Sequence, residues 1–406
     1  MMKHILNIVI LLALFSCNRL LPVAPEDENV LAGPISSLTS SQLALHIKGD
    51  IEFARVFSTE DGLGPIFVQN ACERCHIGDG KGNPAHNLTR FGMYDDNKNW
   101  SSVLSMGGPQ LQHRSILNYD AEKLPSGVAS TQFVAPNVTG LGFLAAVVDE
   151  TILESADPFD VDGDGISGVV NYIDAPDWLT PDNRYHQIQF NGKYIGRFGR
   201  KAAAIDLTMQ TVGAYKQDMG ITSDFDPIDP INPYSSVFAD DNVADPEIPA
   251  STVNKVVFYL QTLKAPNRRN ENDEDVLQGE KLFETVGCTA CHFPEMETGA
   301  SEIESLNNVK FAAYTDMLLH DMGSDLDDDY TEGVVETSEW RTMPLWGLGL
   351  QADSQGALMY LLHDGRATSF DEAIQYHGGE SLKSKENYNA LSETEKEQLV
   401  KFLESL

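Results

Sequence analysis

Apolar positions near the end of the chain recur at the spacing of an α-helix. Ser392 and Glu395 form a capping box, in which the two side chains satisfy the first free backbone donors of a helix. The apolar residues that follow lie at i, i+3, i+4 and i+7: Leu399, Phe402, Leu403 and Leu406. The pattern predicts a C-terminal helix that packs one apolar face against a core.

Two earlier segments show the same periodicity. One places Val276, Gly279 and Phe283 on one helical face, where Gly279 would let another helix approach closely. The other ends before the helix-stopping Pro266. Its apolar residues are Val253, Val256, Val257, Leu260 and Leu263. First and last helices that cross would close the second half of the chain into a domain.

A polar stretch at residues 265–272 separates these two helices. We therefore predict one domain over residues 45–265 and another over residues 270–406. The first domain contains an insert of more than about a hundred residues. In it, Asn191-Gly192 between apolar residues predicts a β hairpin with a type I′ turn. The expected fold is mainly α, with short β hairpins in the insert.

The first residues have the pattern of an export signal. Lys3 and His4 precede an apolar run over residues 5–15, which is too short to span a bilayer. The run ends at Cys17 in a segment that resembles a bacterial lipobox, although Phe15 is bulkier than usual. We predict a lipoprotein-type signal peptide at residues 1–17 and a tether at residues 18–45. The alternative is an ordinary signal peptide, cut nearby, with Cys17 discarded.

Composition narrows the possible partners. The 406 residues are 42% hydrophobic, enough to bury a core, and carry a formal net charge of −33. An acidic surface repels phosphates and therefore argues against nucleic-acid binding. It would attract a basic partner such as a small cytochrome. Together with the signal, this predicts a protein of the periplasm or cell envelope that contacts the membrane only through a lipid on Cys17.

The cysteines carry the strongest chemical signal. Besides Cys17 there are two Cys-x-x-Cys-His motifs, and no cysteine is left for a structural disulfide. Their residues are Cys72, Cys75 and His76, and Cys288, Cys291 and His292. In this motif two thiols on one turn add to the haem vinyl groups, and the adjacent histidine ligates the iron. A zinc site could use both pairs, but it leaves the two histidines unexplained. We predict two covalently attached haem c groups in two cytochrome c-like domains.

Further motifs occur in an order that resembles one known family. They include Gly-Arg-Phe-Gly-Arg-Lys-Ala at residues 196–202. The others lie at residues 62–65, 107–112, 135–142, 319–323, 344–350 and 363–367. The chain is thereby identified as similar to the di-haem oxidoreductases, relatives of the bacterial di-haem cytochrome c peroxidases. The resemblance covers most of the chain and implies an oxidoreductase with hydrogen peroxide as a candidate substrate.

The resemblance implies catalytic residues between the haem motifs. In di-haem peroxidases a Gln and, shortly after it, a Glu-Met-Gly lie on the distal side of the first haem. Here Gln210 and Asp218-Met219-Gly220 resemble them, with Asp for Glu and a tighter spacing. A carboxylate there can take a proton from one peroxide oxygen and return it to the leaving oxygen. The alternative for Asp218 is a surface acid at a helix end.

The resemblance also bears on the sixth iron ligands. In the peroxidases a Met ligates the second haem, and residues 370–379 resemble that region with His377 at its place. His/His ligation would lower the potential relative to Met/His. His363 is expected beside the haem rather than on the iron. For the first haem, His86 and His113 are expected to be ordinary loop residues, so an open or water-bound site is predicted.

One acidic segment has the pattern of a calcium loop. Oxygen ligands would come from Asp160, Asp162, Asp164, the carbonyl of Ile166, and Asn171. Asn171 stands where such loops carry a bidentate Glu, so weaker affinity is expected. The alternative is an acidic turn without metal.

The leading hypothesis is an exported di-haem oxidoreductase that reduces hydrogen peroxide with electrons from a small cytochrome. Electrons would enter at the His292 haem and pass to the His76 haem. Two alternatives stay open: an electron carrier without a substrate, and an accessory protein for metal acquisition or haem-linked modification of a partner.

Overall fold

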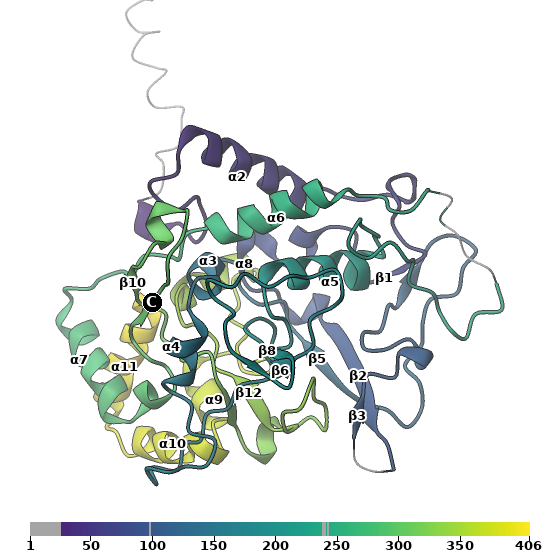
Figure 1. Cartoon of the computed structure of the whole chain (residues 1–406). Coiled ribbons are helices and arrows are strands. Elements are labelled where there is room, and N and C mark those ends of the chain that lie inside the picture. The colour runs from purple at the N-terminus through teal and green to yellow at the C-terminus, as the bar shows by residue number, and fades with distance from the viewer. Residues whose placement is uncertain (1–25, 97–98, 238–240, 242) are drawn as a thin grey trace, which may run out of the picture.

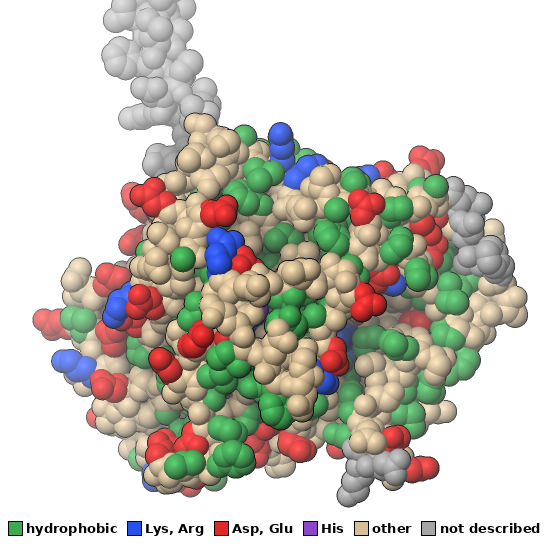
Figure 2. Space-filling view, viewed as in Figure 1, with side chains coloured by type: hydrophobic (Ala, Val, Ile, Leu, Met, Phe, Trp, Pro, Cys, Tyr) green, Lys and Arg blue, Asp and Glu red, His purple; other side chains and the backbone are tan. Residues whose placement is uncertain are grey.

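The computed structural model describes residues 26–406 except 97–98, 238–240 and 242. The predicted signal peptide, Cys17 and the first part of the predicted tether lie outside the described residues. Within the described part, no helix has the length and apolarity needed to cross a membrane. Figure 2 shows acidic side chains scattered over the visible face, with fewer basic ones among them.

Helices occur throughout the described chain. They are α2 (Ser40–Phe53), α3 (Leu141–Ala145), α4 (Asp149–Leu153), α5 (Leu207–Met219), α6 (Ala250–Thr262), α7 (Glu274–Thr285), α8 (Gln351–Ser354), α9 (Phe370–Gln375), α10 (Leu382–Asn389) and α11 (Glu393–Ser405). The predicted helices around residues 253–263, 276–283 and 393–406 correspond to α6, α7 and α11. The capping box at Ser392 is formed, because its side chain and that of Glu395 exchange hydrogen bonds with the backbone.

The strands are short and form several small antiparallel sheets. They are β1 (Ile66–Phe67), β2 (Leu88–Tyr94), β3 (Trp100–Ser101), β4 (Arg114–Ser115), β5 (Ala129–Phe133), β6 (Tyr172–Ile173), β7 (Gln189–Phe190), β8 (Lys193–Ile195), β9 (Met296–Glu297), β10 (Lys310–Phe311), β11 (Leu319–Asp321) and β12 (Glu339–Arg341). The orders are β3-β2-β5, β6-β8-β7 and the pairs β1-β4, β10-β9 and β11-β12. The predicted hairpin is β7–β8, with Asn191 and Gly192 at positive φ.

The predicted fold class is wrong. The structure is 34% helical and 12% strand, so it is not mainly α, and it does not show two cytochrome c-like haem domains. The prediction gave most weight to the periodic helices that flank the haem motifs. Much of the chain between them is instead irregular, and sheets such as β11-β12 occur in the second half as well as in the insert.

Helices far apart in sequence pack in pairs that contain a glycine at the contact. Figure 1 shows α2 lying alongside α6, and α7 close to α11. A Cβ added at Gly49 would collide with the carbonyl of Lys255, and one at Gly279 with the carbonyl of Gln398. The expectation that Gly279 permits a close helix approach is confirmed.

Two apolar cores lie beside the haem motifs. The second contains Val276, Phe283, Leu399 and Phe402 from α7 and α11. The first contains residues from Phe53 to Leu263, and also Met296, Phe311 and Trp346 from beyond the predicted domain boundary. The division at residues 265–270 stays a prediction, and a core shared across it joins the two parts.

Candidate functional site

The second Cys-x-x-Cys-His motif follows the end of α7. Gly287 has φ 94°, a left-handed conformation that lets the chain leave the helix and enter the turn of Cys288. The Nδ1 atom of His292 lies 2.9 Å from the carbonyl oxygen of Tyr314. This hydrogen bond places the proton on Nδ1 and leaves Nε2 as the free ring nitrogen. Burial lowers the pKa of His292 to about 4, so the ring is neutral, as an iron ligand must be.

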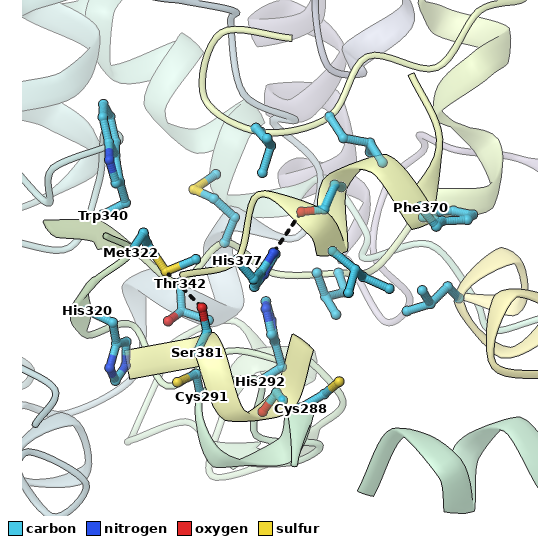
Figure 3. Close-up of a pocket in the computed structure, with 18 of the residues that line it drawn as sticks. Cys288, Cys291, His292, His320, Met322, Trp340, Thr342, Phe370, His377 and Ser381 are labelled. Carbon is cyan, nitrogen blue, oxygen red and sulfur yellow. Dashed lines mark hydrogen bonds between the residues drawn. The ribbon is translucent and has the colours of Figure 1, made fainter. Parts of the chain in front are cut away.

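His377 meets this motif from another element. It follows α9, and its Nδ1 lies 2.8 Å from the carbonyl oxygen of Ala373. Its Nε2 is therefore free, and burial lowers its pKa as well. Figure 3 shows the rings of His292 and His377 facing one another in one cavity, with Cys288 and Cys291 beside His292.

The cavity fits a haem by its chemistry. Two thiols and two neutral imidazoles with free Nε2 atoms supply attachment points and axial ligands. Much of the remaining lining is apolar, and includes Leu345, Leu361, Phe370, Ile374 and Leu399. The four cysteines that the structure describes are all free. Burial raises the pKa of the Cys288 thiol to about 12, which argues against a reactive redox dithiol.

The first motif has the same local arrangement. Cys72 and Cys75 lie on one 3₁₀ turn, and the Nδ1 of His76 lies 2.8 Å from the carbonyl oxygen of Pro136. Burial lowers the pKa of His76 to about 4 and raises that of both thiols to about 12. The ring of Phe53 lies with its centroid 6.0 Å from that of His76. The described donor set at this motif is two thiols and one neutral imidazole.

Asp218 lies beside the first motif, at the end of α5. Its carbonyl oxygen accepts hydrogen bonds from the backbone N–H groups of Val68 at 2.7 Å and Gln69 at 3.0 Å, shortly before the motif, and its charge acts to raise the pKa of Cys72 and Cys75. Its Oδ1 accepts a hydrogen bond of 2.6 Å from Nε2 of Gln110. Burial raises the pKa of Asp218 to about 6, while the bond from Gln110 and the charge of Arg90 oppose the rise. A carboxyl with such a pKa can both accept and return a proton near neutral pH.

The structure does not bring Gln210 to Asp218. Gln210 is exposed and lies eight residues earlier on α5, about 12 Å along the helix axis. Gln110 contacts Asp218 instead, and it also donates to the carbonyl of Gln217 at 2.9 Å. Gln110 belongs to the motif at residues 107–112, but its separation of 108 residues from Asp218 hid the pairing.

A half-buried ion pair holds Gln110 in place. Arg90 lies on β2 and bonds to Glu332 at 2.5 Å. Its Nη1 donates to Oε1 of Gln110 at 3.3 Å and to Oε1 of Gln217 at 2.5 Å. Because Arg90 satisfies the amide oxygen of Gln110, the amide nitrogen is oriented toward Asp218. Neither Arg90 nor Gln110 was singled out from the sequence as a site residue.

The other histidines have different surroundings. His363 hydrogen-bonds Asp328 at 2.7 Å and stacks on Trp340, with centroids 3.8 Å apart, which agrees with a place beside the haem. His320 was not singled out from the sequence. It is buried between Asp316 at 2.8 Å and Glu380 at 2.6 Å. Hydrogen bonds to Asp316, Cys291 and Glu380 raise its pKa to about 12 against the effect of burial.

The acidic loop is formed differently from the prediction. Asp160, Asp162 and Asp164 are exposed on one turn, but Asn171 is fully buried elsewhere. Its amide donates to the carbonyls of Lys201 and Glu332, both at 2.8 Å, so it does not complete the loop. Ile166, whose backbone carbonyl was the predicted ligand, is half-buried. Asp157 replaces Asn171 in the cluster, with an oxygen close to those of Asp160 and Asp162. Calcium binding stays a prediction.

Comparison with known proteins identifies a family and finds weakly similar solved structures. Residues 118–406 match the family model described as "Di-haem oxidoreductase, putative peroxidase". No curated protein sequence matches the chain. A solved structure of hydrazine synthase from Kuenenia stuttgartiensis, pressurized with xenon, is 15% identical, with a TM-score of 0.38. The alignment covers 96% of this chain and 94% of that one, but a likeness this weak carries no argument.

Proposed function

The chain belongs to the di-haem oxidoreductase family, and from this membership we propose that it reduces hydrogen peroxide with electrons from a small basic cytochrome. The observation that carries the proposal is the Asp218–Gln110 pair beside Cys72 and Cys75. It offers a proton acceptor with a pKa of about 6 next to one of the two motifs.

Both haems are proposed to be attached through thioethers to the four cysteines. His76 and His292 would be the proximal ligands, and His377 the second ligand of the haem at His292. When bound, the haems supply the electron-transfer chemistry and the iron at which an oxygen substrate reacts. Hydrogen bonds from Nδ1 of His76 and His292 to backbone carbonyls support this, since they fix each ring for ligation through Nε2.

Asp218 would handle the protons. Reduction of hydrogen peroxide to two waters consumes two electrons and two protons and breaks one O–O bond. The ionised carboxylate accepts a proton from one peroxide oxygen and, as the acid, delivers it to the departing oxygen. Gln110 holds the carboxyl group in position through the 2.6 Å hydrogen bond, and Arg90 holds Gln110.

The function is tested by optical and electron paramagnetic resonance spectra of the isolated and half-reduced protein, with a pyridine haemochrome count. We expect two c-type haems for each chain, one of them high-spin with a spectrum that shifts when peroxide is added. Two low-spin irons that do not respond to peroxide would instead assign the chain to electron transfer without catalysis.

The variant His377→Met is expected to raise the reduction potential of the haem at His292, because Met/His ligation favours the reduced iron more than His/His ligation. Spectroelectrochemistry measures the change, and the haem count should stay at two. His113→Gln is the matched control, since His113 is exposed and does not line the cavity. An unchanged potential in His377→Met would contradict ligation by His377.

The proposed location is the cell envelope, with a lipid on Cys17. An acidic chain with a net charge of −33 would attract a basic electron donor from a distance. Because salt screens this attraction, the donor's association rate should be the quantity most sensitive to ionic strength.

A further inference from the structure

Three buried cations line the cavity that contains His292 and His377. They are Lys81, Arg200 and Arg341, with 6%, 6% and 5% of their surface exposed. Lys81 comes from the loop after the first motif, Arg200 from the segment before α5, and Arg341 from the end of β12. The backbone N–H of Arg341 donates to the carbonyl of Arg200 at 3.0 Å, which keeps the two arginines together.

None of these three cations forms a salt bridge within the described residues. Lys81 donates to the carbonyl of Leu362 at 2.9 Å, and Arg200 to that of Val134 at 2.7 Å. Arg341 donates to the carbonyl of Gly199 at 2.9 Å and to the sulfur of Met343 at 3.1 Å.

Arg197, which is also buried, is paired differently. It binds Asp149 at 2.7 Å. The charges of Asp364 and Asp316 do act on these cations, but Asp364 is paired with Arg366 and Asp316 with His320.

Several donors at the cavity also have no hydrogen-bond partner in the described structure. They are Nε of Arg200, Nη1 of Arg341 and Nδ2 of Asn137. Burial lowers the pKa of Arg200 to about 9 and that of Arg341 to about 10. Burying like charges together without an anion in direct contact is unfavourable, because each loses its hydration and repels the others. A ligand that brings negative charge and acceptor oxygens would remove both costs.

We propose that Lys81, Arg200 and Arg341 form a binding site for carboxylate groups, filled by the propionates of the haem attached at Cys288 and Cys291. This rests on the proposed haem attachment. A planar guanidinium matches a carboxylate with two parallel hydrogen bonds, so the two arginines suit this ligand better than lysines would. The other source of the same chemistry is a diffusible carboxylate that enters the cavity.

The test is the reduction potential of each haem in Arg200→Gln, measured by spectroelectrochemistry at fixed ionic strength. Loss of a cation beside the propionates disfavours the added electron of the reduced haem. We expect the ferrous-to-ferric ratio of the His292 haem at a given potential to fall about tenfold, a downward shift of about 59 mV for a one-electron couple. Arg200→Lys keeps the charge and should restore most of the potential.

Arg268→Gln is the matched control. Arg268 is paired with Glu280 at 2.8 Å and does not line the cavity. The ferrous-to-ferric ratio of each haem at a given potential should therefore stay within about twofold of the wild-type ratio. If Arg200→Gln does not fold, Arg341→Gln gives the same measurement. An unchanged potential in a variant that carries two haems would overturn the site.

Titration of the wild-type protein with acetate at constant ionic strength distinguishes the two sources of carboxylate. Propionates that already fill the site leave the potential independent of acetate. A saturable shift would show that a diffusible carboxylate fills the site and would overturn the assignment to propionates. Absence of the second haem from the wild-type protein would overturn the proposed function itself, before any variant is compared.

Discussion

Asp218→Asn is expected to lower the rate of peroxide reduction by about 10²- to 10⁴-fold while both haems stay bound. The amide has nearly the same shape as the carboxyl group but cannot accept and return a proton. Because the carboxylate only accepts its 2.6 Å bond from Gln110, the amide oxygen of asparagine can keep that contact. Steady-state turnover with a reduced donor and the haemochrome count together measure the effect.

The pH dependence separates proton transfer from a structural effect. The folded pKa of Asp218 is about 6, so kcat/KM should fall as the pH decreases through 6, where the carboxylate becomes protonated. This limb of the profile should disappear in Asp218→Asn. Asp218→Glu restores a carboxyl group and should recover part of the rate. Unchanged turnover in Asp218→Asn would remove Asp218 from the mechanism.

Replacing both Cys288 and Cys291 with alanine is expected to reduce the covalently bound haem from two groups to one for each chain. The two thiols are the attachment points of the second motif, and the remaining ligands His292 and His377 hold a haem only by coordination. The haem count after denaturation and the intact mass of the chain measure the loss.

The matching variant at the other motif replaces Cys72 and Cys75, and it should also leave one covalent haem. The two variants should differ in spectrum, since the remaining haem is the proposed open one in the first case and the proposed His/His one in the second. Two haems that survive denaturation in either variant would contradict thioether attachment.

Sequence reasoning located the elements whose signals are local. The helix before Cys288, the capped C-terminal helix and the β7–β8 hairpin each depend on residues close together in the chain. The mainly α fold class was wrong because short strands such as β1 and β4 pair across about fifty residues, and two-residue strands carry no readable periodicity.

The site could be predicted only in part for the same reason. Each haem motif is contiguous in sequence, but the partner of Asp218 is Gln110, which the segment between β3 and β4 brings to the end of α5. Asn171 fits the spacing of a calcium loop, yet its buried amide is used to join two carbonyls. The spacing of residues in the sequence shows which side chains are available, but it does not show which of them form hydrogen bonds with one another in the fold.

The shared first core also has a consequence for the order of events during synthesis. The ribosome completes Cys72, Cys75 and His76 more than two hundred residues before Met296, Phe311 and Trp346, which belong to the same core. Until those residues arrive, the core around the first motif cannot close. The nascent chain therefore keeps its first pair of thiols accessible at least until these later residues of the core have been made.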